Sequence, residues 1–284
     1  MSTMVTRELP REAAPTGPAP RPARRRRWTR FILPTYSGLV MFYLVAPILV
    51  IILYSFNDSG FKKVSFRWLG FTTEWYKRLF DIPDLTLALK NSLVVASVST
   101  VLATIFGTLI ALALVRYQFR GKRATDFVMF MAISAPEVVL GASLLSLFIT
   151  LGVARGMLTI ILSHVMFNIA FVTVTVRARL LGFDRSLEEA AQDLGAGPWA
   201  TFRRVTLPII LPGIIAGALL AFALSIDDFV ITNFNAGATQ TFPLWVYGAV
   251  KVGIPPQVFV MGTLIFLGGV LIAIGTVFMN RRKA

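Results

Sequence analysis

Long apolar runs without any charge constrain the fold of this chain more than any other feature. The run from Phe31 to Phe56, for example, contains no charged residue. A helix of about 20 apolar residues is long enough to cross roughly 30 Å of hydrocarbon. Only 15% of the 284 residues are charged, against about 25% in a typical soluble protein. These features predict an all-α membrane protein and argue against a soluble globular enzyme.

We predict six transmembrane helices in the part of the chain from residue 31 to residue 284. The first apolar run is too long for the core of a signal peptide, so we expect it to remain in the mature protein. The predicted spans are 31–56, 91–115, 126–152, 157–176, 209–233 and 257–279.

The positive charges predict how these spans are oriented. With both termini in the cytoplasm, the cytoplasmic segments carry 20 of the 28 Lys and Arg residues, as the positive-inside rule requires. Because the basic residues lie mostly beside spans or in residues 1–30, the charge of +14 does not indicate a nucleic-acid partner. Residues 1–30 are predicted to be a disordered cytoplasmic tail. Two roles are open for its Arg24–Arg27 run, contact with anionic membrane lipid or enforcement of the topology alone.

One cytoplasmic segment, residues 184–208, has the pattern of a helical hairpin. Ser186 and Glu189 form a capping-box pattern that predicts a helix start at Ser186. Gly195 can end this helix, and Pro198 suits the first position of a second helix, which is expected to run through Phe202 to Pro208. From local physics alone, a capped surface hairpin and a docking element are both open.

The spacing within this hairpin resembles the EAA loop of ABC importer permeases. Glu189-Ala190-Ala191 is followed after three residues by Gly195 and after nine more by Val205-Thr206-Leu207-Pro208. The family has Ile where this chain has Val205. The resemblance implies a type I (MetI-like) permease fold and a loop that docks on an ATP-hydrolysing subunit. Arg203 or Arg204, together with Glu189, offers charge for pairing. The residues that carry this expected coupling role are Glu189, Ala190, Ala191, Gly195, Leu207 and Pro208.

The same resemblance implies partners and a location. We expect a second permease subunit, two ATP-binding subunits and an extracytoplasmic substrate-binding protein, assembled in the bacterial inner membrane. No G-x-x-x-x-G-K-[ST] phosphate loop occurs in this sequence, so ATP is expected on the partner subunit and no cofactor is expected on this chain.

Apart from Asp126 at the very edge of a span, three acids lie within predicted spans, where a charge is costly and therefore suggests a function. Glu137 follows Pro136, which should kink the third span near the middle of the membrane. Asp227 and Asp228 lie near the outer end of the fifth span, and on a helix only one of them could fully face a pathway. These three acids are the candidate substrate-pathway residues. One aspartate can line the path while the other caps a helix or meets headgroups. The structural alternatives are a Glu137 paired with a buried donor such as Asn168 or His164, and an interfacial aspartate pair that only marks the end of a span.

His164 is the only histidine, and the chain has no cysteine. It therefore lacks the partners for a metal site, and we expect a neutral His164 hydrogen-bonded between helices. Trp245 and Tyr247 could hold an ammonium group by cation–π contact, although anchoring at the membrane interface is the more ordinary role for such residues.

At finer grain, the chain resembles the permeases of spermidine/putrescine importers from about residue 31 to residue 280. The matching segments include Ala135-Pro136-Glu137-Val138-Val139 and Ser225-Ile226-Asp227-Asp228-Phe229. The expected function is half of a polyamine pathway, driven by ATP hydrolysis on a separate subunit, with no enzymatic activity on this chain. The alternatives are import of another small cation (an amino acid derivative, a quaternary amine or iron) and an ATP-independent secondary transporter or channel. A membrane-embedded enzyme is disfavoured, because a nucleophile motif is missing.

Overall fold

The computed structural model describes residues 29–59 and 67–281, and it divides the chain into two units. The first unit, Met1–Leu49, is described only from residue 29 and is helical there. The second unit, Val50–Ala284, contains the remaining helices. The predicted disordered tail at 1–30 lies almost entirely outside the described residues.

The described residues form helices, and their only β-pairing is an isolated bridge between Asn57 and Phe71. The elements in chain order are α1 (Thr29–Tyr54), α2 (Glu74–Lys77), α3 (Pro83–Arg116), α4 (Lys122–Ser134), α5 (Glu137–Thr150), α6 (Met157–Leu181), α7 (Ser186–Asp193), α8 (Pro198–Thr201), the π-helix η1 (Phe202–Thr206), α9 (Leu207–Asp227), α10 (Val230–Asn235), α11 (Phe242–Val252) and α12 (Pro256–Arg281). The prediction of an all-α fold is confirmed.

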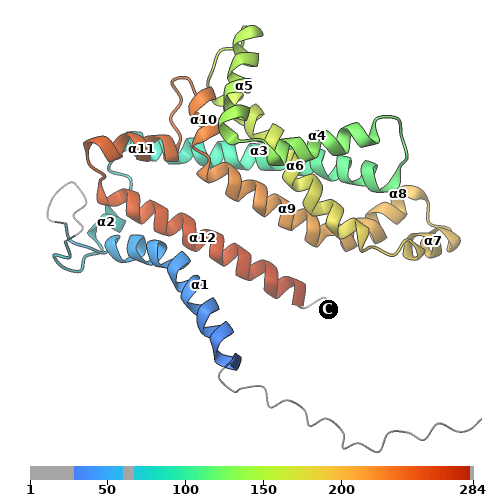
Figure 1. The fold of residues 1–284 in the computed structure, drawn as a ribbon, viewed down its shortest axis with the longest axis horizontal. Coiled ribbons are helices and arrows are strands. Elements are labelled where there is room, and N and C mark those ends of the chain that lie inside the picture. Colours follow the sequence, from blue (N-terminus) through green and yellow to red (C-terminus); the bar gives the residue numbers. More distant parts are fainter. Residues whose placement is uncertain (1–28, 60–66, 282–284) are drawn as a thin grey trace, which may run out of the picture. The chain divides into compact units, whose positions relative to one another are not determined.

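The core of the second unit is built from α3, α6 and α9, which pack side by side (Figure 1). Its buried residues are mostly small or β-branched: Ala103, Ala111, Val172, Val176, Leu180, Ile210 and Ala221. Gly107 allows α3 to approach α6 closely, because a Cβ atom at this position would lie 2.8 Å from Val172. Small residues at such contacts let helix backbones pack tightly where lipid surrounds the protein.

Five helical stretches are long and apolar enough to cross a membrane: Phe31–Tyr54, Pro83–Arg116, Met157–Leu181, Pro198–Asp227 and Pro256–Thr276. The pair α4 and α5 makes a sixth span if the two count as one, so the predicted number of spans agrees with the structure. The second span begins earlier than predicted, at Pro83 in place of residue 91, and shortens the preceding loop.

Two predicted spans are broken, which corrects their description as continuous helices. The span predicted at 126–152 divides into α4 and α5, which are bent by 112°. Pro136 disfavours a helical backbone at Ala135, which adopts an extended conformation with ψ of 136°. The kink predicted at Pro136 is therefore confirmed and larger than expected. The span predicted at 209–233 also stops early, because Asp228 is extended with ψ of 121°.

Candidate functional site

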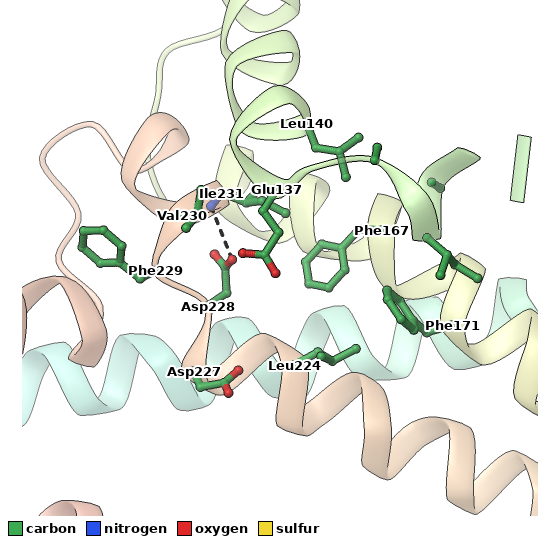
Figure 2. A pocket seen from close by; sticks show the side chains of 13 residues that line it. Glu137, Leu140, Phe167, Phe171, Leu224, Asp227, Asp228, Phe229, Val230 and Ile231 are labelled. Atoms are coloured by element: carbon green, nitrogen blue, oxygen red, sulfur yellow. Dashed lines mark hydrogen bonds between the residues drawn. The ribbon is translucent and has the colours of Figure 1, made fainter. Parts of the chain in front are cut away.

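Both helix breaks border one cavity of about 350 Å³ at the end of α9 (Figure 2). The cavity brings together all three candidate pathway acids, Glu137, Asp227 and Asp228. Around them lie apolar and aromatic side chains from α5, α6, α9 and α10, including Leu140, Phe167, Phe171, Leu224, Phe229 and Ile231. Among the described residues, no Lys or Arg lines this cavity, so the charge of its lining is negative.

Glu137 is placed by the break between α4 and α5. Pro136 precedes the first residue of α5, and Glu137 occupies that first position, where the helix dipole favours a carboxylate. In Figure 2 the Glu137 and Asp228 carboxylates point toward one another beside the ring of Phe167. The Glu137 side chain is exposed and makes no hydrogen bond or ion pair with another described residue. The alternative in which Glu137 pairs with His164 or Asn168 is therefore wrong for this structure.

The adjacent acids Asp227 and Asp228 have different surroundings, because α9 ends between them. Asp228 accepts hydrogen bonds from the backbone N–H groups of Ile231, at 3.3 Å, and Thr232, at 2.8 Å. It thus satisfies the start of α10. Asp227 is exposed and makes no such contact with another described residue. The expectation that one acid caps a helix is confirmed for Asp228.

Asp228 is also the acid that meets His164. The Nε2 atom of His164 lies 3.3 Å from Oδ2 of Asp228 and 2.9 Å from Oγ1 of Thr232. Since the Thr232 hydroxyl donates its proton to Asp228 at 2.7 Å, it must accept from Nε2 of His164. The other ring nitrogen, Nδ1, lies 2.5 Å from Oγ of Ser225. The expected hydrogen bonding of His164 between helices is confirmed.

This buried polar chain reaches a fourth helix through Ser99. The hydroxyls of Ser225 on α9 and Ser99 on α3 are 3.0 Å apart, and both residues are buried. The chain therefore runs from the cavity at Asp228 through α10 and α6 to α9 and α3. Most buried polar groups in proteins are hydrogen-bonded, and here the bonded groups hold one wall of the cavity in place.

The cavity is suited to a cation. Two carboxylates, those of Glu137 and Asp227, face it without a polar partner among the described residues. A carboxylate–ammonium pair at about 4 Å gains roughly 1–4 kcal/mol in water-accessible surroundings. The aromatic rings beside the carboxylates can also contact an ammonium group or a methylene chain. Within the described residues, no group of three or more His, Cys, Asp or Glu side chains could hold a metal ion.

The second candidate region, residues 184–208, is a helical hairpin at the opposite end of α9 (Figure 1). Helix α7 begins at Ser186 as predicted, and Gly195, with φ of +86°, follows its last turn. Glycine adopts this left-handed conformation without strain. Pro198 opens α8 as predicted, but the second helix does not end at Pro208, since α8 and η1 continue into α9.

The capping box expected between Ser186 and Glu189 is wrong. Asp184 supplies the cap, because its Oδ1 atom accepts a hydrogen bond from the backbone N–H of Ser186 at 3.0 Å. This hydrogen bond lowers the pKa of the Asp184 carboxyl. A carboxylate two residues before a helix satisfies a free N–H group as well as a serine does, which the sequence pattern alone did not resolve.

Among the predicted coupling residues, Glu189, Ala190, Gly195 and Pro208 are exposed, whereas Ala191 and Leu207 are half-buried. Arg203 and Arg204 are also exposed. The neighbouring Glu188 points inward and forms an ion pair with Arg116, the last residue of α3. Sequence reasoning missed Glu188. Two consecutive glutamates in a short amphipathic helix were a signal, because only one of them can face solvent fully.

Sequence reasoning also missed the aromatic wall of the cavity, Phe167, Phe171 and Phe229. Phe167 and Phe171 are four residues apart in α6, a spacing that looks like ordinary core packing, and Phe229 lies between α9 and α10. Trp245 packs in a core cluster with Leu85 and Met261. The ring of Tyr247 lies 4.7 Å from that of Phe229 at an angle of 44°, and the Lys251 ammonium lies 5.3 Å from the Tyr247 ring centre. The cation–π contact considered for Tyr247 is thus present with a residue of the same chain.

Comparisons with known proteins bear on both regions. Residues 103–284 match the family model described as "Binding-protein-dependent transport system inner membrane component". The chain is 40% identical over 255 residues to the spermidine/putrescine transport system permease protein PotC of Escherichia coli (strain K12), which covers 89% of this chain and 96% of the relative. It is 43% identical over 236 residues to the putrescine transport system permease protein PotI of the same strain, with 80% and 83% covered.

Two solved structures have a similar fold. A bacterial ABC transporter that imports the acidic polysaccharide alginate aligns with a TM-score of 0.63 at 18% identity, covering 93% of this chain and 99% of that one. The MetNI methionine ABC transporter aligns with a TM-score of 0.59 at 19% identity, covering 70% and 96%. At these identities the likeness shows the fold alone.

Proposed function

Because this chain belongs to the family of inner-membrane components of binding-protein-dependent transport systems, we propose that it is a permease subunit of an ABC importer for polyamines such as spermidine and putrescine. It is a transport subunit and not an enzyme. The observation that carries the polyamine assignment is a pair of carboxylates, Glu137 and Asp227, that share one cavity at the end of α9 and bond no other residue in the part of the chain that the structure describes. The names of the relatives PotC and PotI support it.

The cavity chemistry fits a flexible polycation. Each ammonium group can exchange its hydration for a carboxylate, and the methylene stretches between the ammonium groups can lie against Phe167, Phe171 and Leu140. Two acids on different helices, α5 and α9, give moderate attraction at each step, so the substrate is held without being trapped. Asp228, already bonded to His164 and Thr232, keeps the cavity wall in place.

The hairpin at 184–208 is the proposed docking site for an ATP-binding subunit. Its outer surface combines the Glu189 carboxylate with two large apolar side chains, Leu194 at 90% exposure and Trp199 at 71%. Exposed groups of this kind are typical of a protein interface. The small residues Ala190 and Gly195 leave room for a partner to approach closely.

The remaining assembly follows from the family. We propose a second permease subunit that completes the pathway, two ATP-binding subunits that bind the ATP, and an extracytoplasmic binding protein that delivers the substrate. The positive charges on the predicted loops support a cytoplasmic location for both termini. ATP-driven closure would move the hairpin and switch the cavity between outward-facing and inward-facing states.

The test is uptake of labelled putrescine and spermidine by cells that lack their own polyamine importers. These cells would express the chain with its partner permease, ATPase and binding protein. We expect energy-dependent uptake that unlabelled polyamine competes away. If the assembled complex hydrolyses ATP without taking up polyamine, the substrate is another small cation. Uptake that does not depend on ATP or on the ATPase subunit would favour a secondary transporter.

A further inference from the structure

One carboxylate oxygen of Glu188 joins three helical elements at the base of the hairpin. The Nη2 atom of Arg116, at the end of α3, donates to Oε1 of Glu188. The hydroxyl of Thr206, at the end of η1, donates to the same oxygen. Arg116 Nη2 also lies 3.3 Å from the Thr206 hydroxyl. We call this three-residue contact the Glu188 clamp.

The clamp is sheltered from water, unlike most surface ion pairs. The side chain of Glu188 is 15% exposed and that of Arg116 is 26% exposed, while Thr206 is fully buried. Exposed ion pairs contribute little because water screens them, but shielded pairs with additional hydrogen bonds hold their geometry more firmly. A second tie lies beside the clamp, where Nη2 of Arg185 donates to the carbonyl oxygen of Val115 at 3.1 Å. The hairpin is thus hydrogen-bonded to the end of α3 through two of its residues, Glu188 and Arg185.

The elements joined by the clamp lead to the cavity. Helix α9 follows Thr206 directly and ends at Asp227, a length of roughly 30 Å at about 1.5 Å per residue. Helix α3 runs from Arg116 back to Ser99, which bonds Ser225 and through it His164 and Asp228. Two continuous helices therefore connect the clamp with two of the cavity acids.

The clamp also coincides with the irregular part of the hairpin. Thr206 closes the π-helix η1, Phe202–Thr206, and π-helical turns inside α-helices occur frequently at functional sites. The neighbouring Glu189 is exposed. The two consecutive glutamates project about 100° apart around the helix axis, so Glu188 contacts the protein and Glu189 is exposed to solvent.

We propose that Glu188 is a positioning residue that transmits movement of the hairpin to α3 and α9, whereas Glu189 contacts the ATP-binding subunit. This inference rests on the proposed function, because it requires an ATPase that moves the hairpin. Loss of the Glu188 carboxylate leaves the outer surface of the hairpin intact. It breaks the contacts that hold the hairpin to the end of α3 and to the start of α9. The ATPase subunit then still binds the hairpin and hydrolyses ATP, but the cavity no longer changes its accessibility when nucleotide binds.

The absence of cysteine from the whole chain makes a direct test possible. Ala132 lines the cavity, so an Ala132→Cys variant places a single thiol there. The complete complex would be purified, and the rate at which a charged maleimide labels this chain would be compared without nucleotide and with ATP plus vanadate. This measurement does not depend on which substrate the complex transports.

In the Ala132→Cys background we expect ATP plus vanadate to change the labelling rate by about tenfold, within the usual range of coupling between two sites. With Glu188→Gln added, the ratio should fall to near one while the amount of bound ATPase subunit stays the same. Exchange of the two charges, Glu188→Arg with Arg116→Glu, should restore much of the response. Asp126→Asn is the matched control, because it breaks the Asp126–Arg177 ion pair between α4 and α6 without touching the hairpin.

Two results would overturn the inference. A Glu188→Gln complex that keeps the full labelling response shows that the clamp transmits nothing. Loss of ATPase binding in that variant, equal to the loss in Glu189→Lys, would make Glu188 a docking residue. If ATP plus vanadate does not change the labelling rate of Ala132→Cys even with Glu188 present and the ATPase subunit bound, the proposed coupling function itself fails. That outcome is distinct from a failure of the Glu188 proposal alone.

Discussion

A pair of consecutive acids lies near each end of α9, Glu188 and Glu189 on α7 near its start and Asp227 and Asp228 at its end. In each pair, one acid is bonded to the protein and the other is not. At the hairpin, Glu188 is bonded to Arg116 and Thr206, and Glu189 is exposed. At the cavity, Asp228 is bonded to His164 and Thr232, and Asp227 has no partner among the described residues.

The difference between the ends lies in what surrounds the unpartnered acid. Glu189 lies on an outer surface with exposed Leu194 and Trp199, whereas Asp227 shares a cavity with Glu137 and aromatic rings. An acid whose carboxylate is hydrogen-bonded within the protein stabilises the local structure, whereas an acid without such bonds is available to bind a partner or ligand. By position, the free acid at the hairpin suits a protein partner and the free acid at the cavity suits a small cation.

Charge reversal in the cavity should have the largest effect. We expect Glu137→Lys to reduce polyamine uptake by about a hundredfold or more, since an ammonium now stands where substrate charge is needed and each lost 1.36 kcal/mol costs tenfold. Assembly and ATP hydrolysis should remain, because Glu137 contacts no other described side chain through a polar bond. Initial uptake rates at equal complex abundance measure this. Uptake near the wild-type rate would make Glu137 irrelevant to the pathway.

Charge reversal at the hairpin should separate transport from ATP hydrolysis. In Glu189→Lys, we expect normal membrane insertion but at least about tenfold less uptake, because the docking contact is weakened by a charge clash of several kcal/mol. Co-purification of the ATPase subunit and uptake per ATP hydrolysed are the measurements. The control is Glu74→Gln, which alters an exposed pair on α2 far along the chain. Near-normal uptake by Glu189→Lys would contradict the docking role.

Removing the structural acid of the cavity should affect stability as well as uptake. Asp228→Asn weakens the cap of α10 and the contact with His164, at a cost of about 1–3 kcal/mol in the free energy of unfolding. Asp227→Asn should leave stability unchanged, since the Asp227 side chain bonds no other described residue. Thermal unfolding of the purified complexes compares the two. Equal stabilities would show that the two aspartates are not divided as described.

The smallest effect is expected at Asp184, the cap of α7. Its pKa is lowered by the hydrogen bond from Ser186, so its contribution is complete above the ordinary aspartate pKa of about 3.9 and is lost only as the pH falls through the lowered value. Hydrogen-exchange protection of α7 amides should therefore be constant from about pH 8 to pH 5. Asp184→Ala should lower that protection at every pH in this range. A loss of protection in the unmodified chain already near pH 6 would contradict this cap.

Much of this architecture follows from the sequence, because hydrophobic runs and turn residues act locally. The number of spans, the hairpin with its Gly195 and Pro198, and the gathering of acids in spans were all predictable. The partners of the acids were not. His164 and Asp228 are 64 positions apart in the sequence and meet only because α6 and α10 pack together.

The broken spans show the same limit. A proline in an apolar run predicts a bend, but the 112° angle between α4 and α5 depends on what the two helices pack against. Helix α5 packs on α10, where Asn235 donates to the carbonyl of Gly141. Such long-range contacts determine the direction of the chain after a helix break. The periodicity of apolar residues in the sequence does not reveal them.

The most direct test of the division between bonded and free acids is uptake of labelled putrescine by proteoliposomes that contain the complete complex with internal ATP. The unmodified chain would be compared with the double variant Glu137→Gln, Asp227→Asn at equal complex abundance and equal ATP hydrolysis. We expect the double variant to take up putrescine at least about tenfold more slowly, which corresponds to roughly 1.4 kcal/mol, with thermal stability unchanged. Uptake at the unmodified rate would contradict the assignment of these two carboxylates to the substrate pathway.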